Sequence, residues 1–302
     1  MKRLDKLYCD RMARNIRTTS KGKIPGLINK YLVKSDGPGF LLDVGCADGR
    51  FTDYVQKKTG LLVIGLEPNR KLFEQAVKLD REGLAFVNTS LEHFGNNAFG
   101  PGVSSQVKDH YDVVMFSSSL HEISSYCENP EKHYTEEPVK EAIAKAAKML
   151  KPGGLLMIRD FVDSNYPAEM APVRFRTRTV ERDFMKFIKE CPYIDKAVPC
   201  SVDILYGKVK GERAWCVRND LLKEFLLCET WDPECRKREC MERKLVYSAS
   251  ELKGIIMDTG FGFDLEETVF TNEYGERFDK LVEKDKNWHW GRTTELLVAR
   301  KR

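Results

Sequence analysis

The segment 41–50, Leu-Leu-Asp-Val-Gly-Cys-Ala-Asp-Gly-Arg, combines an apolar run, an acid and small residues at every second position. The apolar residues on either side of Asp43 predict a short buried strand. Gly45, Ala47 and Gly49 keep side-chain bulk away from a place where the backbone must approach a ligand. A helix is expected to begin directly afterwards. The segment therefore predicts a strand that leads into a nucleotide-binding turn.

The spacing of these small residues differs from the dinucleotide fingerprint G-x-G-x-x-G. The pattern D-x-G-x-(G/A)-x-G instead resembles the first motif of class I S-adenosylmethionine-dependent methyltransferases, whose ligand presents a carboxylate and an ammonium group in place of a pyrophosphate. The resemblance implies S-adenosylmethionine as the cofactor, with Asp43 as the negative charge near its ammonium group. A nicotinamide-dependent enzyme is the more distant alternative.

Three further matches follow in the order that the family requires. A second apolar strand ends at Glu67, about 20 residues after the glycines, where a carboxylate can accept hydrogen bonds from ribose hydroxyls. A third strand, 85–87, precedes Ser90, which stands where the family commonly holds an acid against the adenine amino group. A fourth strand spans 111–116, and Leu-Lys-Pro-Gly-Gly at 150–154, before a fifth strand, is typical of the family.

The order of these motifs predicts an α/β fold with a doubly wound, mostly parallel seven-stranded sheet whose last strand is antiparallel. The runs 265–270 and 294–300 are expected to be its last two strands, and a mainly helical insertion is expected after the fifth. Four parts follow from this reading. They are a basic N-terminal helical segment, 1–36; the cofactor-binding core, 37–162; a substrate-binding insertion, 163–247; and the C-terminal part of the core, 248–302.

The resemblance assigns cofactor binding to ten residues near the carboxyl ends of the strands. They are Asp43, Gly45, Cys46, Ala47, Gly49, Glu67, Pro68, Ser90, Leu91 and Ser117.

The loop after the fourth strand, Ser-Ser-Ser-Leu-His-Glu, passes beside the sulfonium group and the acceptor in class I methyltransferases. His121 and Glu122 are therefore the predicted catalytic residues. For a hydroxyl acceptor, a neutral imidazole can take the proton near pH 7, with Glu122 fixing or charging it. The alternative is that His121 caps the next helix or orients the cofactor.

The insertion contains an alternating run of arginines, Arg174, Arg176 and Arg178. On a strand their guanidinium groups would share one face and could hold phosphates bidentately. The alternative is an exposed edge or a helix start that pairs with Glu181 and Asp183. Six of the nine cysteines also lie in the insertion, with irregular spacing and no histidine, so we expect buried free thiols and no metal.

The first 34 residues contain ten basic residues and two acidic ones, although the net charge of the whole chain is only +4. An amphipathic helix is expected before Gly22. It could form a basic lid over a polyanion, a solvated face of a packing helix or a mitochondrial transit signal, against which Asp5 and Asp10 argue mildly. The cysteine usage and the absence of a signal-peptide-like start predict an intracellular, cytoplasmic protein, and no apolar run is long enough to span a membrane.

These observations predict a methyltransferase with RNA as the preferred acceptor. One alternative is a small-molecule methyltransferase whose insertion closes a pocket. Another is an inactive subunit that binds the cofactor and a partner, suggested by Ser90. Salt dependence of binding would separate the first two. The sequence does not give the acceptor atom or the oligomeric state.

Overall fold

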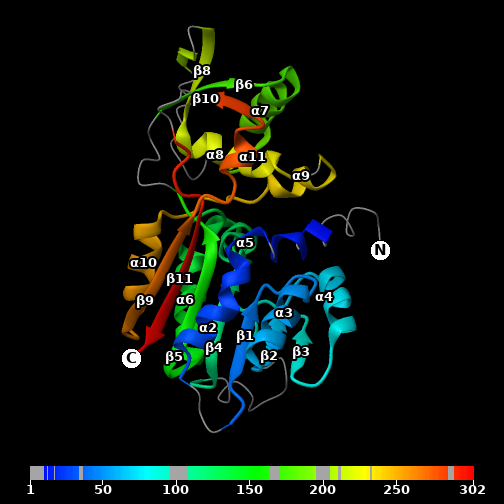
Figure 1. The fold of residues 1–302 in the computed structure, drawn as a ribbon, viewed down its shortest axis with the longest axis vertical. Helices are drawn as coiled ribbons and strands as arrows, with labels where there is room; N and C mark the ends of the chain where they lie inside the picture. The colour runs from blue at the N-terminus through cyan, green and yellow to red at the C-terminus, as the bar shows by residue number, and fades with distance from the viewer. Residues whose placement is uncertain are drawn as a thin grey trace.

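Two β-sheets organise the chain, one in a lower body and one in a cap above it (Figure 1). The computed structural model describes residues 10–11, 13–16, 18–33, 37–95, 108–163, 170–194, 205–209, 212–231, 233–284 and 289–302.

The body contains the seven-stranded sheet that the sequence predicted. Its strands are β1 (Phe40–Val44), β2 (Leu62–Leu66), β3 (Leu84–Val87), β4 (Tyr111–Ser117), β5 (Leu150–Phe161), β9 (Phe263–Thr271) and β11 (Thr294–Lys301). Their order is β3-β2-β1-β4-β5-β11-β9, and β11 runs antiparallel to both of its neighbours. The first five strands pair in parallel. The predicted fold class is therefore confirmed.

Helices cover both faces of this sheet, because the side chains of each central strand alternate between two apolar clusters. One face packs against α2 (Ile24–Tyr31), α3 (Arg50–Thr59) and α4 (Arg70–Ala76). The other face packs against α5 (Leu120–Tyr126), α6 (Glu137–Met149) and α10 (Ala249–Met257). Short 3₁₀ turns occur at η1 (Ser20–Lys23), η2 (Val77–Leu79) and η3 (Pro130–Lys132).

The cap has an antiparallel sheet of order β10-β6-β8-β7. Its elements are β6 (Met170–Phe175), α7 (Arg178–Glu190), β7 (Leu205–Val209), β8 (Glu212–Arg218), α8 (Asn219–Glu229), α9 (Pro233–Glu239), α11 (Gly275–Phe278) and β10 (Val282–Lys284). The insertion was expected to be mainly helical, with a strand considered only at the arginine run, but its described residues also include three strands. In addition, α11 and β10 come from the connection between β9 and β11, so two separate segments of the chain build the cap.

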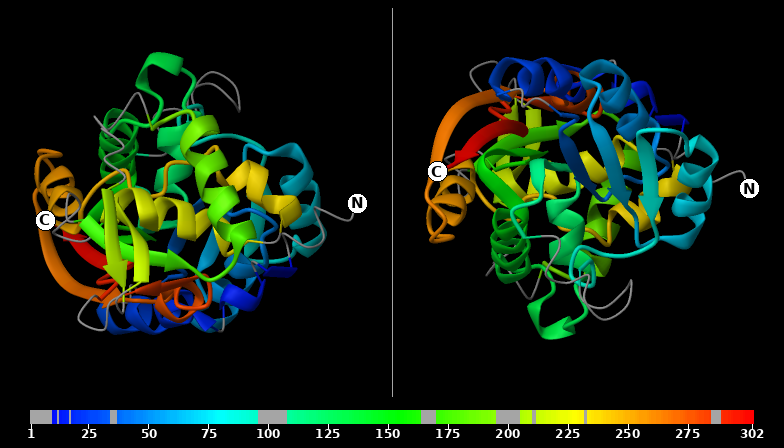
Figure 2. Two further views of the ribbon diagram at one scale, coloured as in Figure 1. Left: turned by 90° about the horizontal axis from the view of Figure 1, so that it is seen from above. Right: turned by 90° about the horizontal axis from the view of Figure 1, so that it is seen from below.

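The cap covers the carboxyl ends of the central strands, as the two end-on views show (Figure 2). Phe161, the last residue of β5, packs in the apolar cluster of the cap, and its ring centroid lies 5.6 Å from that of Tyr274. The N-terminal segment, helical at its described residues between 10 and 16, passes along this junction, and Arg11 donates to the carbonyl oxygen of Thr230. No helix in the described ranges is both long and apolar enough to cross a membrane.

Candidate cofactor site and the junction with the cap

The turn after β1 has the backbone geometry that its small residues allow. Gly45, Ala47 and Gly49 all have positive φ angles, of 77°, 50° and 76°. A Cβ atom on Gly45 would lie 2.6 Å from Cβ of Ser119, and one on Gly49 would lie 2.7 Å from Cζ of Phe86. The two glycines are thus required by the left-handed backbone and by close packing against the protein itself.

Replacing Gly45 by alanine is therefore expected to lower the free energy of unfolding by about 1–3 kcal/mol, the usual range for an overpacked site. The displaced loop should also bind S-adenosylhomocysteine more weakly. Thermal denaturation with and without this ligand measures both effects. The matched control is Gly254→Ala, because Gly254 lies in α10 with nothing within 4 Å of the added Cβ. Equal melting and ligand response in the two variants would contradict the prediction.

A pocket opens at this turn. Its lining residues are Ile16, Lys21, Asp43, Gly45, Cys46, Ala47, Asp48, Arg50, Phe51 and Ser117. Five of the ten predicted cofactor residues are in this set: Asp43, Gly45, Cys46, Ala47 and Ser117. The other five, Gly49, Glu67, Pro68, Ser90 and Leu91, are not among the lining residues.

Two residues of opposite charge, Asp43 and Lys21, line this pocket. Asp43 is 1% exposed, and its Oδ2 atom accepts a hydrogen bond of 2.7 Å from Thr52. Burial raises the pKa of Asp43 to about 6. Lys21, in η1, is 4% exposed, and burial lowers its pKa to about 8. An acid and an amine are therefore both held away from bulk water at one site.

Glu67 lies next to the turn. Its Oε2 atom accepts from the backbone N–H of Ala47 at 2.9 Å, and its Oε1 atom accepts from the N–H of Asn69 at 2.7 Å. Burial, with the negative charge of Glu122 nearby, raises the pKa of Glu67 to about 7. Each carboxylate oxygen can accept a second hydrogen bond. Glu67 is thus fixed in position and still able to bind hydroxyl groups.

The loops after β2 and β3 are tied together beside Glu67. The side-chain amide of Asn88 donates to the carbonyl oxygens of Glu67 and Pro68, at 2.7 and 3.1 Å. Within the described part of the chain, the hydroxyl of Ser90 makes only a local contact, accepting from the N–H of His93 at 3.4 Å. Leu91 is buried in the apolar core of the body. Asn88 could not be identified from the sequence, because its role depends on contacts between two loops.

Arg159 joins three distant segments at the end of β5. It is 2% exposed; its Nε atom donates to the hydroxyl of Ser20 at 3.1 Å, and its other nitrogens bond Ser118 and Glu273. Glu273 also accepts from the N–H of Ser20 at 2.6 Å. We call Arg159, Glu273, Ser20 and Ser118 the arginine latch. It fastens the N-terminal segment over the pocket, because its charges are buried and satisfied by each other.

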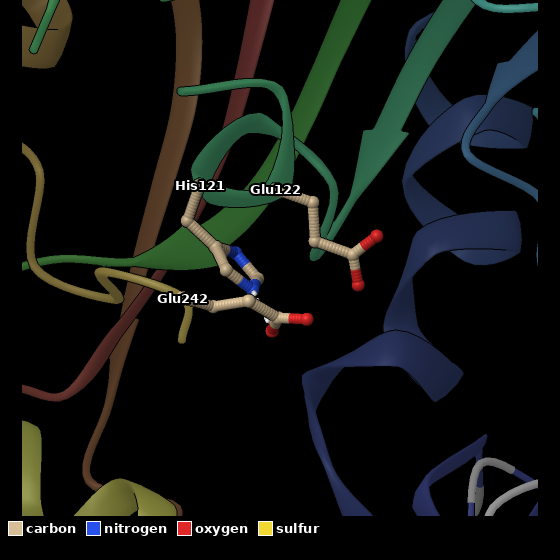
Figure 3. A group of neighbouring side chains, drawn as sticks. All are labelled: His121, Glu122 and Glu242. Atoms are coloured by element: carbon tan, nitrogen blue, oxygen red, sulfur yellow. Dashed lines mark ion pairs between the residues drawn. The ribbon is translucent and has the colours of Figure 1, made fainter. Parts of the chain in front are cut away.

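His121 lies at the junction between body and cap, with its ring next to the carboxylate of Glu242 and with Glu122 nearby (Figure 3). Its Nδ1 atom is 2.7 Å from Oδ1 of Asp160, and its Nε2 atom is 3.8 Å from Oε2 of Glu242. Burial opposes the charged imidazolium, but the charge and hydrogen bond of Asp160 outweigh it and raise the pKa of His121. Asp160 also accepts from the backbone N–H groups of Leu120 and His121 at the start of α5, so it is Asp160 that caps this helix.

The cap surrounds this histidine with further charges. Lys244, which is fully buried, bonds both Glu242 and Glu239. Glu122 lies 3.7 Å from Arg238, and its burial together with the charge of Glu242 raises its pKa. Ligand atoms of His121, Glu122 and Glu242 lie within 4.8 Å of one another. Because Lys244 and Arg238 already compensate these carboxylates, the cluster is an ion-pair network, and its geometry does not call for a metal.

The predicted catalytic pair is thus placed together, but His121 is not presented as a free base. Both ring nitrogens face carboxylates, which favours the imidazolium form. A role in proton abstraction requires the neutral form and stays a prediction.

The predicted arrangement of the three arginines is wrong. The strand β6 ends at Phe175, because the hydroxyl of Thr177 accepts from the N–H of Val180 and caps α7, which begins at Arg178. Arg174 and Arg176 both pair with Glu283 on β10. Their guanidinium groups therefore stabilise the cap sheet. Pairing with acids was the alternative to phosphate binding, but the acid is Glu283 and not Glu181 or Asp183.

Comparison with known proteins shows the family to which this chain belongs. A family model described as a methyltransferase domain matches residues 12–194. No curated protein sequence matches the chain.

Solved structures resemble the chain over most of its length, at low identity. One is an S-adenosylmethionine-dependent methyltransferase from Mesorhizobium loti, with 15% identity, a TM-score of 0.47, and 92% of this chain and 97% of that chain covered. A second is 1,6-didemethyltoxoflavin-N1-methyltransferase from Burkholderia thailandensis, with 12% identity, a TM-score of 0.47, and 98% and 84% covered. A third is the Haloferax volcanii complex between the Trm112 methyltransferase activator and the putative methyltransferase, with 13% identity, a TM-score of 0.48, and 99% and 97% covered.

Because the family model matches more than half of the sequence, the chain belongs to the methyltransferase domain family and is an enzyme that uses S-adenosylmethionine.

Proposed function

We propose that this enzyme methylates a small molecule held between the carboxyl edge of the seven-stranded sheet and the cap. The observation that carries the proposal is the enclosure of this edge. The cap lies over it, and the arginine latch fastens the N-terminal segment beside it. An enclosed site of this kind fits a compact acceptor better than a polymer.

The residues at the pocket fit the cofactor. Asp43 offers a buried negative charge for the ammonium group, and Glu67 offers two fixed oxygens for the ribose hydroxyls. When bound, S-adenosylmethionine supplies a methyl group whose bond to sulfur breaks as the acceptor's lone pair bonds to carbon, leaving a thioether. The protein's own contribution is to align the acceptor with that group and to exclude water.

Four of the basic residues that suggested an RNA acceptor are engaged within the protein. Arg11 bonds the backbone of Thr230, and Lys30 pairs with Glu267 at 2.8 Å. Arg174 and Arg176 pair with Glu283 in the cap. RNA phosphates are bound by lysine and arginine side chains, and side chains that are already paired within the protein are less able to do so. Lys2, Arg3 and Lys6 lie outside the described residues, and RNA is kept as the alternative acceptor.

His121 and Glu122 remain the proposed catalytic residues for an acceptor that must lose a proton. His121 accepts a proton only in its neutral form, and Asp160 raises its pKa above the ordinary value of about 6.5. The rate at limiting substrate should therefore increase with pH above about 6.5 and level off beyond the raised pKa. A pH–rate profile of the wild type and of His121→Gln tests this. The slope should disappear in the variant; an identical slope would remove His121 from the catalytic role.

The proposed acceptor class can be tested by transfer of labelled methyl groups from S-adenosylmethionine to small-molecule, RNA and protein fractions of a strain lacking the gene. We expect label in the small-molecule fraction, with little dependence on salt. Label in RNA that decreases as salt rises would favour the alternative acceptor. No label in any fraction, with the cofactor still bound, would favour an inactive partner subunit. Glu67→Ala serves as the negative control.

A further inference from the structure

A buried amine in the cofactor pocket has no role in the motifs discussed so far. Lys21 lines the pocket together with Asp43, Gly45 and Ser117. It comes from η1 in the N-terminal segment, more than twenty residues before the first motif begins at Asp43. Its position over the pocket is fixed on both sides. Thr19 caps the turn with a bond to the N–H of Lys21 at 3.4 Å, and Ser20 belongs to the arginine latch.

The amine of Lys21 is held in place without a partner of its own. Among the described residues, its Nζ atom makes no hydrogen bond or ion pair, and its nearest described interaction is with the ring of Phe51, 5.4 Å from the ring centroid. A buried ammonium group without an acceptor is unfavourable by several kcal/mol. A bound anion would compensate this loss.

The chemistry of that anion follows from the rest of the pocket. Asp43 and Lys21 place one negative and one positive group around the same space. The amino-acid end of S-adenosylmethionine carries one ammonium group and one carboxylate. We propose that Lys21 binds the carboxylate of the cofactor's methionine half, while Asp43 faces its ammonium group. This assignment rests on the proposed role of Asp43 in cofactor binding.

The charged groups around Lys21 come from several elements. Asp43 lies on β1, Arg159 and Asp160 on β5, and Glu122 on α5. Arg159 lowers the pKa of Lys21 further after burial, whereas the three acids raise it, and the result is about 8. Only the protonated amine attracts a carboxylate, so cofactor binding should take up a proton above pH 8. The affinity for the cofactor should accordingly decrease as the pH rises beyond 8.

The test compares two ligands that differ only at the amino-acid end. S-adenosylhomocysteine carries the carboxylate, whereas 5′-methylthioadenosine keeps the adenosine and thioether but lacks the amino acid. Titration calorimetry of the full chain should show that Lys21→Met weakens S-adenosylhomocysteine about 10- to 100-fold, as expected for one charge-assisted hydrogen bond. Binding of 5′-methylthioadenosine should stay unchanged. Between pH 7.5 and 9.5 the wild type should lose more affinity for S-adenosylhomocysteine than the variant, because the ligand's own ammonium group titrates in both.

The matched control is Lys23→Met, because Lys23 is exposed two residues along the same turn. It should bind both ligands like the wild type. Lys21→Gln provides a second variant in case the methionine variant does not fold.

Unchanged affinity for S-adenosylhomocysteine in the Lys21 variants would overturn the assignment. Equal losses for the two ligands would also overturn it, because they would show a packing role. A higher KM for the acceptor with normal cofactor affinity would assign the amine to the acceptor instead. A wild type that binds neither ligand would contradict the proposed cofactor site as a whole, which distinguishes that failure from the failure of Lys21 alone.

Discussion

Glu67→Ala is expected to weaken binding of S-adenosylhomocysteine by at least about 100-fold. The carboxylate is positioned by the backbone of Ala47 and Asn69 and has free lone pairs for two ribose hydroxyls. Hydrogen bonds to a charged acceptor contribute about 1.5–3 kcal/mol each, and two of them correspond to at least two orders of magnitude in affinity. The substitution also leaves two N–H groups without their acceptor. Methyl transfer should fall below detection at ordinary cofactor concentrations.

Isothermal titration of the two proteins measures this effect. Glu82→Ala is the matched control, since Glu82 is an exposed acid in the turn before β3. It should bind the ligand as the wild type does. A Glu67→Ala protein that melts normally and binds within a few-fold of the wild type would show that this carboxylate does not contact the ribose.

His121→Ala is expected to lower the free energy of unfolding by about 3–5 kcal/mol, the usual loss when one partner of a buried ion pair is removed. The variant leaves Asp160 and Glu242 without the imidazolium that lies between them. These residues belong to the body and to the cap, so the loss should also loosen the junction. Chemical denaturation of the wild type and the variant measures the difference.

The pH dependence of that difference follows from the direction of the pKa shift. The pKa of His121 is raised in the folded protein by Asp160 and Glu242 against the effect of burial. Its stabilising contribution is therefore fully present below the unfolded value of about 6.5, and it is lost as the pH rises through the folded value. The gap between wild type and variant should shrink above that pH.

The control for this prediction is His93→Ala. His93 pairs with Glu128 at 2.5 Å on the surface, where both side chains are more than half exposed. Such a pair contributes about 0–1 kcal/mol. A His121 variant no less stable than the His93 variant would show that the buried network does not hold the cap to the body.

The sheet of the body could be predicted from sequence because its signals are local. Each of the first five strands is an apolar run next to a turn, and the turn at Gly45 has a spacing of small residues that few other sites share. The cap sheet gave no such signal. β10 has three residues and comes from a connection far from β6 in the chain, so no pattern within either segment indicates their pairing.

The site could be predicted where one segment carries all the information, as at Asp43, Gly45 and Ser117. Lys21 was predicted only as part of a basic segment, because its burial depends on the arginine latch, whose members come from four separate parts of the chain. Arg159 and Asp160 did leave a signal. They are two charged residues directly after the apolar run 155–158, and charges in such a position need partners.

The most direct test of the proposed cofactor and acceptor sites is a crystal structure of the full chain with S-adenosylhomocysteine. We expect the amino-acid end of the ligand between Asp43 and Lys21, the ribose hydroxyls at Glu67, and the sulfur atom directed toward the junction beneath the cap. A ligand with its ribose away from Glu67, or with its sulfur directed away from the cap, would contradict both the cofactor site and the enclosed acceptor site proposed for this enzyme.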